Sequence, residues 1–362
     1  MTKAQSNPKI TLPKRPAKRR VTLEQVAIAA GVGRTTVSDI LNRNAADKYQ
    51  PETRKRVEDA VAKLGYTASR AAQQLARGRS GMIGLILTRD LSNPVFANRV
   101  EVVEKAIKQL GYRMQLAFTD GDPEMEASCI EQMQADAVEG LIMGPVYESL
   151  DLEQHKQILQ GHLPVVLFGG TLGSQFDEVG LHPDASIHLA VKHLLSKGHK
   201  RVGFLGAPKP RTAEGPSRLF ETYLKDAGLK NPGPIIWSPD TDRYDDYYPV
   251  SEAFVKQWQA MDKNQRPTAM LCHNDQMAQT TIAACHKAGI RVPEDLSLVG
   301  YENAPGSAYL IPALTSIDNR GDQQMRQAIE LLMDRIQHPR KTSEKRVIYP
   351  ELIERDSVLD LR

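Results

Sequence analysis

Several classes of protein are excluded by what this sequence lacks. None of its apolar runs approaches the ~20 residues that a membrane-spanning helix requires. The first twenty residues are basic, but no apolar stretch of signal-peptide length follows them, so we expect a cytoplasmic protein with no membrane partner. Its three cysteines, Cys129, Cys272 and Cys285, form no Cys-x-x-Cys pair, which fits a reducing compartment and argues against a disulfide framework.

Common catalytic and metal-binding motifs are also missing. None of the nine histidines is followed by glutamate, so there is no His-Glu-x-x-His zinc site. The sequence has neither a Gly-x-x-x-x-Gly-Lys-Ser/Thr phosphate loop nor a Gly-x-Ser-x-Gly nucleophile elbow. His273, beside Asn274 and Asp275, resembles half of an acid–base pair, but a residue at the end of a strand is the better interpretation. We therefore predict that the protein is not an enzyme and has no cofactor.

The charge of the chain is unevenly distributed. The net charge is +3, yet residues 1–80 hold 17 Lys or Arg against 6 Asp or Glu, which gives them +11 and leaves −8 for the rest. A basic head on an acidic body suits a polyanionic partner, because each neutralised phosphate releases counterions. For residues 1–20, which read as a disordered arm, a solvated tail explains the charge as well. For residues 34–79, where the charge lies on patterned helices, nucleic acid is favoured.

Residues 21–66 have the pattern of three short helices. Thr22 and Gln25 have the spacing of a capping box, and apolar residues follow on one helical face as far as Gly31. A second short helix comes next, and a third begins at Pro51. Small residues between the first two helices let them cross closely, as in a helix-turn-helix, whose second helix enters the major groove of DNA.

From residue 82 onward, short apolar runs alternate with helical patterns. Strands are expected at 82–88, 112–118, 140–144, 164–168, 201–206, 268–273 and 296–301. Helices are expected at 94–110, 122–136, 184–198, 216–228, 274–289 and 320–338. This alternation predicts doubly wound parallel sheets, and the length suggests two lobes. Small molecules bind such folds beyond the carboxyl ends of the strands, here in the cleft between the lobes.

Short motifs recur along the chain in a fixed order. They are Val21-Thr22-Leu23, Ala30-Gly31-Val32, Thr36-Val37-Ser38, Leu64-Gly65-Tyr66, Ile83-Gly84-Leu85, Asn93-Pro94, Asn274-Asp275, Val292-Pro293 and Gly300-Tyr301. In these motifs and their spacing the chain, from Val21 to about Ser357, resembles the lactose-repressor (LacI/GalR) family of bacterial transcription regulators.

The resemblance implies a fold class and a domain order. The fold is a small all-α helix-turn-helix head plus a hinge helix, joined to a two-lobed, periplasmic-binding-protein-like α/β core of doubly wound parallel sheets. The head would span 21–66, the hinge 67–79 and the core 80–357. Within the core, the expected first lobe takes 80–178 and 314–342, and the second takes 179–313 and 343–357.

The resemblance also implies which residues contact DNA. Arg34, Thr35 and Asp39 occupy the base-reading positions of the second helix, and Ser38 and Asn42 would hold phosphates. The expected DNA-binding set in the head is Thr22, Leu23, Arg34, Thr35, Thr36, Ser38, Asp39 and Asn42. Aspartate can only accept hydrogen bonds, for example from cytosine N4, so we expect a half-site that differs from the commonest family operators. The alternative is that Asp39 touches no base.

The segment 67–79 is interpreted as a hinge helix that orders only when something packs against it. Ser69 can cap it, and Leu75 matches the family leucine that wedges between base pairs in the minor groove. Ser69, Gln73, Leu75 and Ala76 complete the expected DNA-binding set. A flexible tether with Leu75 packed on the core is the alternative.

Six positions are candidates for binding a small-molecule effector. By the resemblance, Asn274 retains a ligand-binding asparagine, Glu302 replaces a carboxylate, and Gly169 replaces another carboxylate with no side chain. An expected arginine falls on Pro216 without a gap, so Arg218 or Arg211 takes its place. The effector set is Phe96, Gly169, Arg218, Tyr247, Asn274 and Glu302, with Tyr247 at an aromatic lid position. The incomplete set leaves open a sugar, an atypical small molecule, or a core that dimerises without any ligand.

The leading hypothesis is a repressor that binds a near-palindromic, double-stranded DNA operator as a homodimer, with an affinity modulated by an effector in the cleft. The family tail that makes tetramers lies beyond the core, and this chain stops at Arg362, so a dimer is predicted. The alternative is a periplasmic-type solute-binding protein without DNA function. The basic helical head and the missing signal peptide argue against it.

Overall fold

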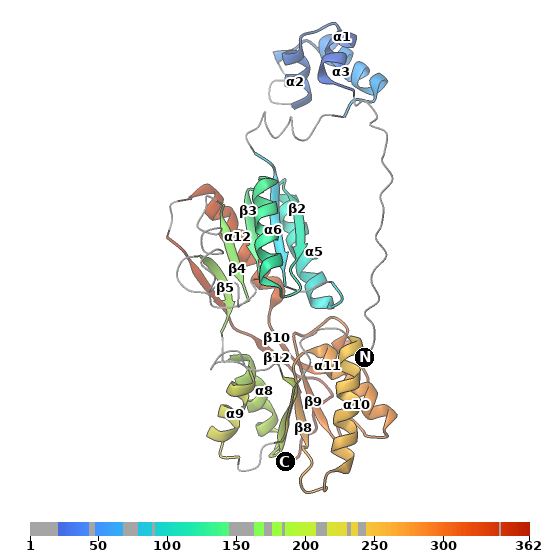
Figure 1. Ribbon diagram of the computed structural model, residues 1–362, viewed down its shortest axis with the longest axis vertical. Helices are drawn as coiled ribbons and strands as arrows, with labels where there is room; N and C mark the ends of the chain where they lie inside the picture. Colours follow the sequence, from blue (N-terminus) through green and yellow to red (C-terminus); the bar gives the residue numbers. More distant parts are fainter. Residues whose placement is uncertain are drawn as a thin grey trace. The chain divides into compact units, whose positions relative to one another are not determined.

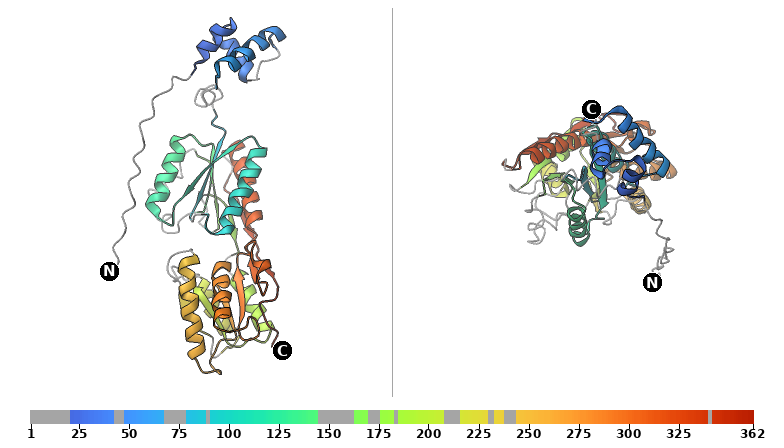
Figure 2. Two further views of the ribbon diagram at one scale, coloured as in Figure 1. Left: turned by 90° about the vertical axis from the view of Figure 1, so that its right-hand side faces the viewer. Right: turned by 90° about the horizontal axis from the view of Figure 1, so that it is seen from above.

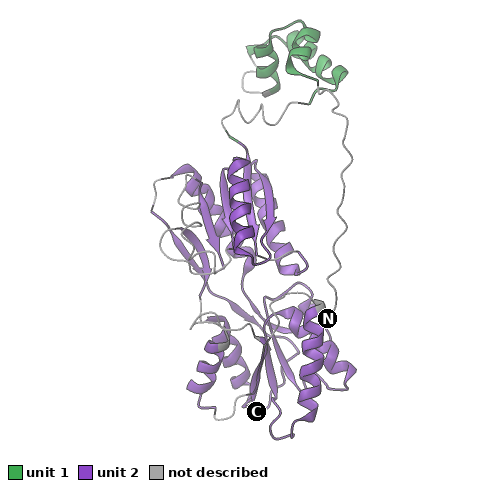
Figure 3. Cartoon of the chain, in the orientation of Figure 1, with its two compact units in different colours: residues 1–79 green, residues 80–362 purple. Residues whose placement is uncertain are grey.

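The chain forms two compact units, residues 1–79 and residues 80–362 (Figure 3). The computed structural model describes residues 21–42, 48–67, 79–88, 91–144, 163–169, 176–182, 185–207, 216–229, 233–237, 244–339 and 342–362. The expected arm at 1–20 and most of the expected hinge lie outside these ranges. Among the described helices, none combines the length and the apolar character needed to cross a bilayer.

The described residues of the first unit form three helices: α1 (Leu23–Ala30), α2 (Arg34–Asn42) and α3 (Pro51–Leu64). The predicted capping box is present, since Thr22 Oγ1 accepts from the backbone N of Gln25 at 3.3 Å and Gln25 Oε1 accepts from Thr22 N at 2.9 Å. Gly31 ends α1 with φ +65°, a left-handed conformation that glycine adopts without steric cost. One apolar cluster joins the helices; its buried members are Val26, Ala27, Ala30, Val37, Ile40, Val57 and Ala60.

The first lobe of the second unit is built on a parallel sheet in the order β11-β5-β4-β3-β1-β2. Its strands are β1 (Met82–Leu87), β2 (Arg113–Phe118), β3 (Gly140–Met143), β4 (Val165–Phe168), β5 (Asp177–Leu181) and β11 (Lys345–Ile348). Helices α5 (Pro94–Gln109) and α12 (Gly321–Gln337) cover one face, and α6 (Pro123–Ala135) covers the other (Figure 2). Burial on both faces explains the nearly continuous apolar strands.

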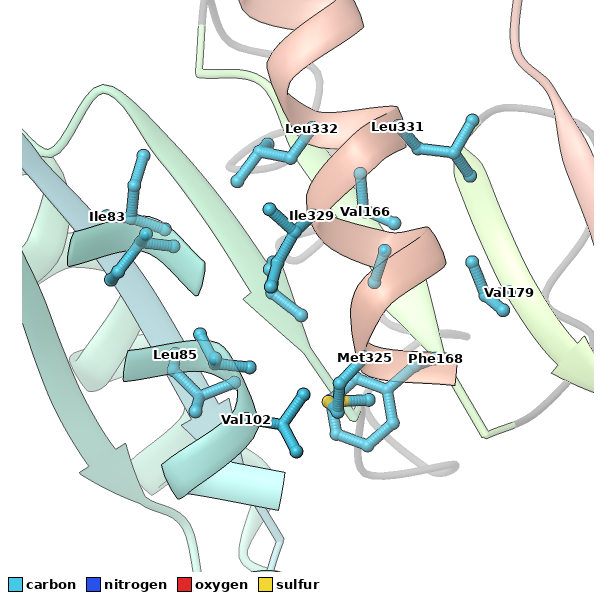
Figure 4. Packing of buried hydrophobic residues seen from close by; sticks show 14 of the residues in the cluster. Ile83, Leu85, Val102, Val166, Phe168, Val179, Met325, Ile329, Leu331 and Leu332 are labelled. Carbon is cyan, nitrogen blue, oxygen red and sulfur yellow. The ribbon is translucent and has the colours of Figure 1, made fainter. Parts of the chain in front are cut away.

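Helix α12 supplies much of this lobe's core. Its residues Met325, Ile329 and Leu332 pack against strand residues such as Ile83 and Val166 (Figure 4). These side chains recur at helical spacing, so one face of the helix is apolar along its whole length. This packing joins a helix from the C-terminal part of the chain to strands that lie about 150 to 240 residues earlier in the sequence. The core of the lobe therefore depends on contacts between distant segments of the chain.

The second lobe is built on a sheet in the order β12-β10-β9-β8-β6-β7, parallel except for β12. Its strands are β6 (Val202–Ala207), β7 (Ile235–Trp237), β8 (Ala269–Cys272), β9 (Ser297–Tyr301), β10 (Thr315–Asp318) and β12 (Glu351–Ile353). Helices α10 (Tyr244–Ala260) and α11 (Asp275–Lys287) cover one face, and α8 (Ala185–Ser196) and α9 (Pro216–Asp226) cover the other (Figure 1). A short helix, η3 (Ser307–Tyr309), lies between β9 and β10.

The expected lobe boundaries are wrong at all three crossings. We expected the chain to change lobes near residues 178, 314 and 343. Instead, β5 stays in the first lobe, β10 pairs with β9 in the second, and β11 pairs with β5 in the first. The chain crosses after β5, after β10 and between β11 and β12, because each of these strands completes its pairing with its own sheet before the chain leaves it.

Candidate functional site

The second helix of the first unit turns one polar face outward. Val37 and Ile40 are buried in the apolar cluster, whereas Arg34 and Thr35 are exposed and Asp39 is half-buried. Ser38 and Thr36 are half-buried as well. Since α2 begins at Arg34, the exposed residues lie in the first turns of the helix, the part that meets base edges when such a helix enters a major groove.

Arg34 is held only loosely within the protein. Its Nε lies 3.2 Å from Glu24 Oε2 of α1, and both side chains are largely exposed. Exposed ion pairs of this kind contribute little stability. Thr22 is committed to capping α1, and Leu23 is half-buried beside the cluster. Arg34 can therefore exchange its carboxylate partner for a base or a phosphate at small cost.

Asp39 has a partner that sequence reasoning did not find. Its Oδ2 accepts a hydrogen bond from the hydroxyl of Tyr49 at 2.8 Å. This hydrogen bond is the main reason why the pKa of Tyr49 is raised. The bond fixes the carboxylate on the outward face of α2 and occupies one of its two oxygens.

Several expected DNA contacts cannot be placed. Ser69, Gln73, Leu75 and Ala76 lie outside the described residues, and Asn42 is described only in its backbone at the end of α2.

A cavity of about 420 Å³ lies at the carboxyl ends of strands from both lobes. Asn98 and Arg99 of α5 line it from the first lobe, and Glu302 and Asn303, which follow β9, line it from the second. Asp322, in the first turn of α12, completes this part of the wall. In the second lobe, the cavity lies at the carboxyl ends of β9 and β10, at the edge of the sheet where parallel α/β folds bind ligands.

The backbone is strained at this cavity. Glu302 and Asn303 have φ values of +95° and +49°, in a region that residues with side chains rarely adopt. Hydrogen bonds hold the turn: Asn303 N donates to Ser316 Oγ at 3.0 Å, and Arg355 Nη2 donates to Asn303 Oδ1 at 2.7 Å. Strained residues that the surroundings hold in place are concentrated at ligand sites and switches.

Arg99 is the most unusual side chain of the cavity. Its Cζ lies 5.2 Å from the centre of the Phe96 ring and 5.7 Å from that of Phe168. Burial lowers the pKa of Arg99, while the negative charge of Glu302 opposes that shift. An arginine keeps its proton even so, so a positive charge sits between two aromatic rings.

Of the six expected effector residues, the structure places only Glu302 on the cavity wall. Phe96 is half-buried beside Arg99, Gly169 is exposed at the end of β4 with φ +90°, and Arg218 is exposed on α9. Arg211 lies outside the described residues.

The side chains of Asn274 and Tyr247 lie close together and are hydrogen-bonded to each other. Asn274 Oδ1 caps α11 by accepting from Met277 N at 2.9 Å, and its Nδ2 donates to the Tyr247 hydroxyl at 3.1 Å. Tyr247 is fully buried in the core between α10, α11 and the sheet, so it is not a lid over this cavity.

A buried carboxylate supports the strained turn from below. Asp275, at the start of α11, accepts from Ser307 Oγ at 2.5 Å, Ser316 Oγ at 2.6 Å and Ala304 N at 2.7 Å. Burial raises its pKa, and these hydrogen bonds oppose the shift. Among the described residues, no group of His, Cys, Asp or Glu side chains is arranged to hold a metal ion.

Comparison with protein families matches both parts of the chain. Residues 22–69 match the model of bacterial regulatory proteins of the lacI family, and residues 191–358 match the periplasmic binding protein-like domain. The first match covers α1, α2 and α3. It disfavours the alternative of a solute-binding protein without DNA function.

Individual proteins match over nearly the full length. The HTH-type transcriptional repressor PurR of Klebsiella pneumoniae (strain 342) is 32% identical over 344 residues, which are 94% of this chain and 97% of the relative. The solved Lac repressor dimer bound to operator and the anti-inducer ONPF shares the fold with a TM-score of 0.76 at 24% identity, covering 94% of this chain and 100% of that one. The complex of the transcriptional regulator CelR with cellobiose has a TM-score of 0.62 at 25% identity, over 93% and 100% of the two chains. The protein therefore belongs to the lacI family of bacterial regulatory proteins.

Proposed function

We propose that the protein represses transcription by binding a near-palindromic DNA operator as a homodimer, under the control of a small molecule bound between the lobes of its core. It acts in the cytoplasm, where its DNA target is, and it catalyses no reaction. Its named full-length relatives are repressors, which supports the first part of the proposal.

The outward face of α2 is the observation on which the proposal mainly rests. Arg34 and Thr35 are exposed at the start of a helix whose opposite face is locked into the unit by Val37 and Ile40. A rigid helix with a free polar face at its N-terminal end fits a major groove about 12 Å wide. Asp39, on the same face, would accept a hydrogen bond from a base, while Leu75 of the hinge would enter the minor groove.

Dimerisation is supported by exposed apolar side chains at the end of η3 and directly after it. Tyr309 is 86% exposed and Ile311 is 92% exposed, although both are large and apolar. Large apolar side chains that stand together at the surface mark contact sites. We place the homodimer contact on this part of the second lobe, where a second copy would cover both side chains.

The cavity gives the effector a way to act on DNA affinity. It has walls from both lobes, and the only covalent links between the lobes in the described chain are the three crossings. A ligand that contacts both walls favours one angle between the lobes. In a dimer, that angle sets the separation of the two DNA-binding heads, which couples the two sites.

Fluorescence anisotropy with labelled duplexes tests the DNA-binding proposal. The full-length protein should bind a fragment of its own promoter region more tightly than random duplex of equal length. The double variant Arg34→Ala, Thr35→Ala should lose this preference and retain non-specific binding. Lys63→Ala, on the exposed end of α3, is the matched control: it should weaken binding to all duplexes about equally. Equal affinity of the wild type for promoter and random duplex would refute the proposal.

A further inference from the structure

The cavity wall contains a buried positive charge that the protein does not pair. Arg99 is 9% exposed, and in the described part of the chain its Nε has no hydrogen-bond partner. The nearest opposite charge that acts on it, Glu302, is not within ion-pair distance, and the rings of Phe96 and Phe168 flank the guanidinium. A buried charge without a partner costs several kcal/mol, so such a group is normally found where a ligand pairs with it.

The N-terminus of α12 lies against the same guanidinium. A Cβ on Gly321 would come within 3.3 Å of Arg99 Nε, so the absence of a side chain at 321 allows this close approach. The N-cap residue, Arg320, supplies no side-chain cap. Gly321, Asp322 and Gln323, the first residues of this 17-residue helix, line the cavity, and the N–H groups of a first helical turn have no intrahelical acceptor. Unpaired N–H groups and the helix dipole favour an anion at this point.

Carboxylates form other parts of the wall. Glu302 Oε2 accepts from Asn93 Nδ2 at 3.2 Å, and Asp322 Oδ1 accepts from Asn98 Nδ2 at 2.5 Å. A carboxylate oxygen can accept more than one hydrogen bond, so both side chains can also accept from a hydroxyl group of a ligand.

The remaining charged groups of the wall all have partners within the protein. Asp318 accepts from Arg320 N at 2.6 Å and from Asn303 Nδ2 at 3.1 Å, and Arg320 pairs with Glu351. The cavity thus combines a positive charge at Arg99, beside the start of α12, with carboxylate acceptors at Glu302 and Asp322.

We propose that the effector is a small hydroxylated acid. Its carboxylate or phosphate group binds the Arg99 guanidinium and the first N–H groups of α12, and its hydroxyl groups donate to Glu302 and Asp322. This inference builds on the proposed regulatory function, since it names the chemical class of the molecule that the cavity binds. It distinguishes this cavity from one that recognises neutral sugars through hydroxyl groups alone.

Matched pairs of probes test the inference on the full-length protein. Each pair differs only in the acidic group: glucose and glucuronate, galactose and galacturonate, ribose and ribose 5-phosphate. We expect an acidic member to raise the melting temperature and to give a measurable Kd by calorimetry, while its neutral partner does not. Comparison of the carboxylate and phosphate probes shows which acidic group Arg99 and the start of α12 prefer.

Variants of Arg99 locate the binding. Arg99→Leu should weaken the affinity for the acid about 10- to 100-fold, the range expected for losing a charge-assisted pair of hydrogen bonds. Arg99→Lys keeps the positive charge but loses the planar pair of guanidinium donors, so its affinity for the acid should lie between those of the wild type and Arg99→Leu. Arg326→Leu removes the same charge from the exposed side of α12 and should bind the acid like the wild type. Unchanged affinity in Arg99→Leu, equal binding of neutral partners, or no binding of any acid would overturn the inference.

The stability of the ligand-free variants separates this role from a structural one. If Arg99 serves a ligand, Arg99→Leu should melt at the same temperature as the wild type or higher, because it removes an unpaired buried charge. A structural role predicts a large fall instead, and that result would also count against the inference. Operator binding by the same variants, without ligand, shows whether the regulator itself is intact, so the two proposals can fail separately.

Discussion

Replacing Asp39 with asparagine changes the hydrogen-bonding pattern on the outward face of α2, which we propose reads the bases, but leaves its shape the same. Aspartate offers acceptors only, and its Oδ2 is already engaged by the Tyr49 hydroxyl at 2.8 Å. The remaining oxygen would select a donor such as cytosine N4. Asparagine has a single oxygen, which the Tyr49 hydroxyl would occupy, so its NH2 donor is left to face the base. Asp39→Asn should therefore exchange the preferred base at one position of each half-site from cytosine to a base that presents an acceptor in the major groove, such as a purine at N7.

The size of the effect follows from the number of free oxygens. A good two-bond contact discriminates by about 1–3 kcal/mol, or roughly 5- to 150-fold. Because Tyr49 occupies one oxygen, we expect Asp39 to make a single bond and to lie at the low end, about 5- to 10-fold. Tyr49→Phe frees the second oxygen and should leave the preferred base unchanged. In Asp39→Asn, the raised pKa of Tyr49 should move back toward its ordinary value, which a spectroscopic titration measures.

Selection from randomised half-sites, followed by sequencing, measures the preference of each variant. Glu58→Gln, on the exposed face of α3, is the control for removing one negative charge from the head without touching α2. Both neutralising variants should gain non-specific affinity, since each removes a repulsion with phosphates. If Asp39→Asn and the wild type select the same base at every position, Asp39 touches no base and the reasoning fails.

Three further predictions concern the core. Asp275→Ala leaves three donors without an acceptor, so the free energy of unfolding should fall by on the order of 3 kcal/mol in denaturant titrations; a change below 1 kcal/mol would contradict this. Burial lowers the pKa of both His199 and His193, so the unfolded chain takes up protons first and the free energy of unfolding should fall from about pH 7 to about pH 5; His199→Gln should remove part of this dependence, because His193 remains. Burial raises the thiol pKa of Cys272, and that of Cys285 to about 12, so a thiol reagent should modify at most Cys129 in the native protein and all three cysteines after denaturation.

Local features of this fold were predictable from sequence because short-range physics decides them. The capping box of Thr22 and Gln25 and the left-handed stop at Gly31 involve neighbours in the chain. The outward face of α2 follows in the same way, since helical spacing places Val37 and Ile40 inside and leaves Arg34 outside. The parallel sheets follow from strands that are apolar on both faces.

The parts that sequence reasoning missed depend on distant partners. Helix α10 went unpredicted because it begins with a polar, tyrosine-rich segment and contains Pro249 in its second turn, where a proline removes a helical hydrogen bond and so argues against a helix. The short strand β7 has three residues, too few for a periodic pattern. The lobe crossings are set by the sheet that each strand joins, and nothing in β10 or β11 alone reveals that choice.

At the candidate effector site, too, the contacts that sequence reasoning missed are contacts between distant residues. One residue of this site, however, could have been noticed in the sequence. Asn274 and Tyr247, which we expected to face a ligand, form a hydrogen bond with each other that no pattern in the sequence reveals, and their contact with a ligand stays a prediction. Arg99 was not expected, although it stands between Phe96 and Val103 on the apolar face of a predicted helix. A charge at such a position must have a partner in the fold or in a ligand. Because the described protein supplies no hydrogen-bond partner to Arg99 Nε, this interruption of the apolar face is better evidence about the ligand than any position carried over from the family.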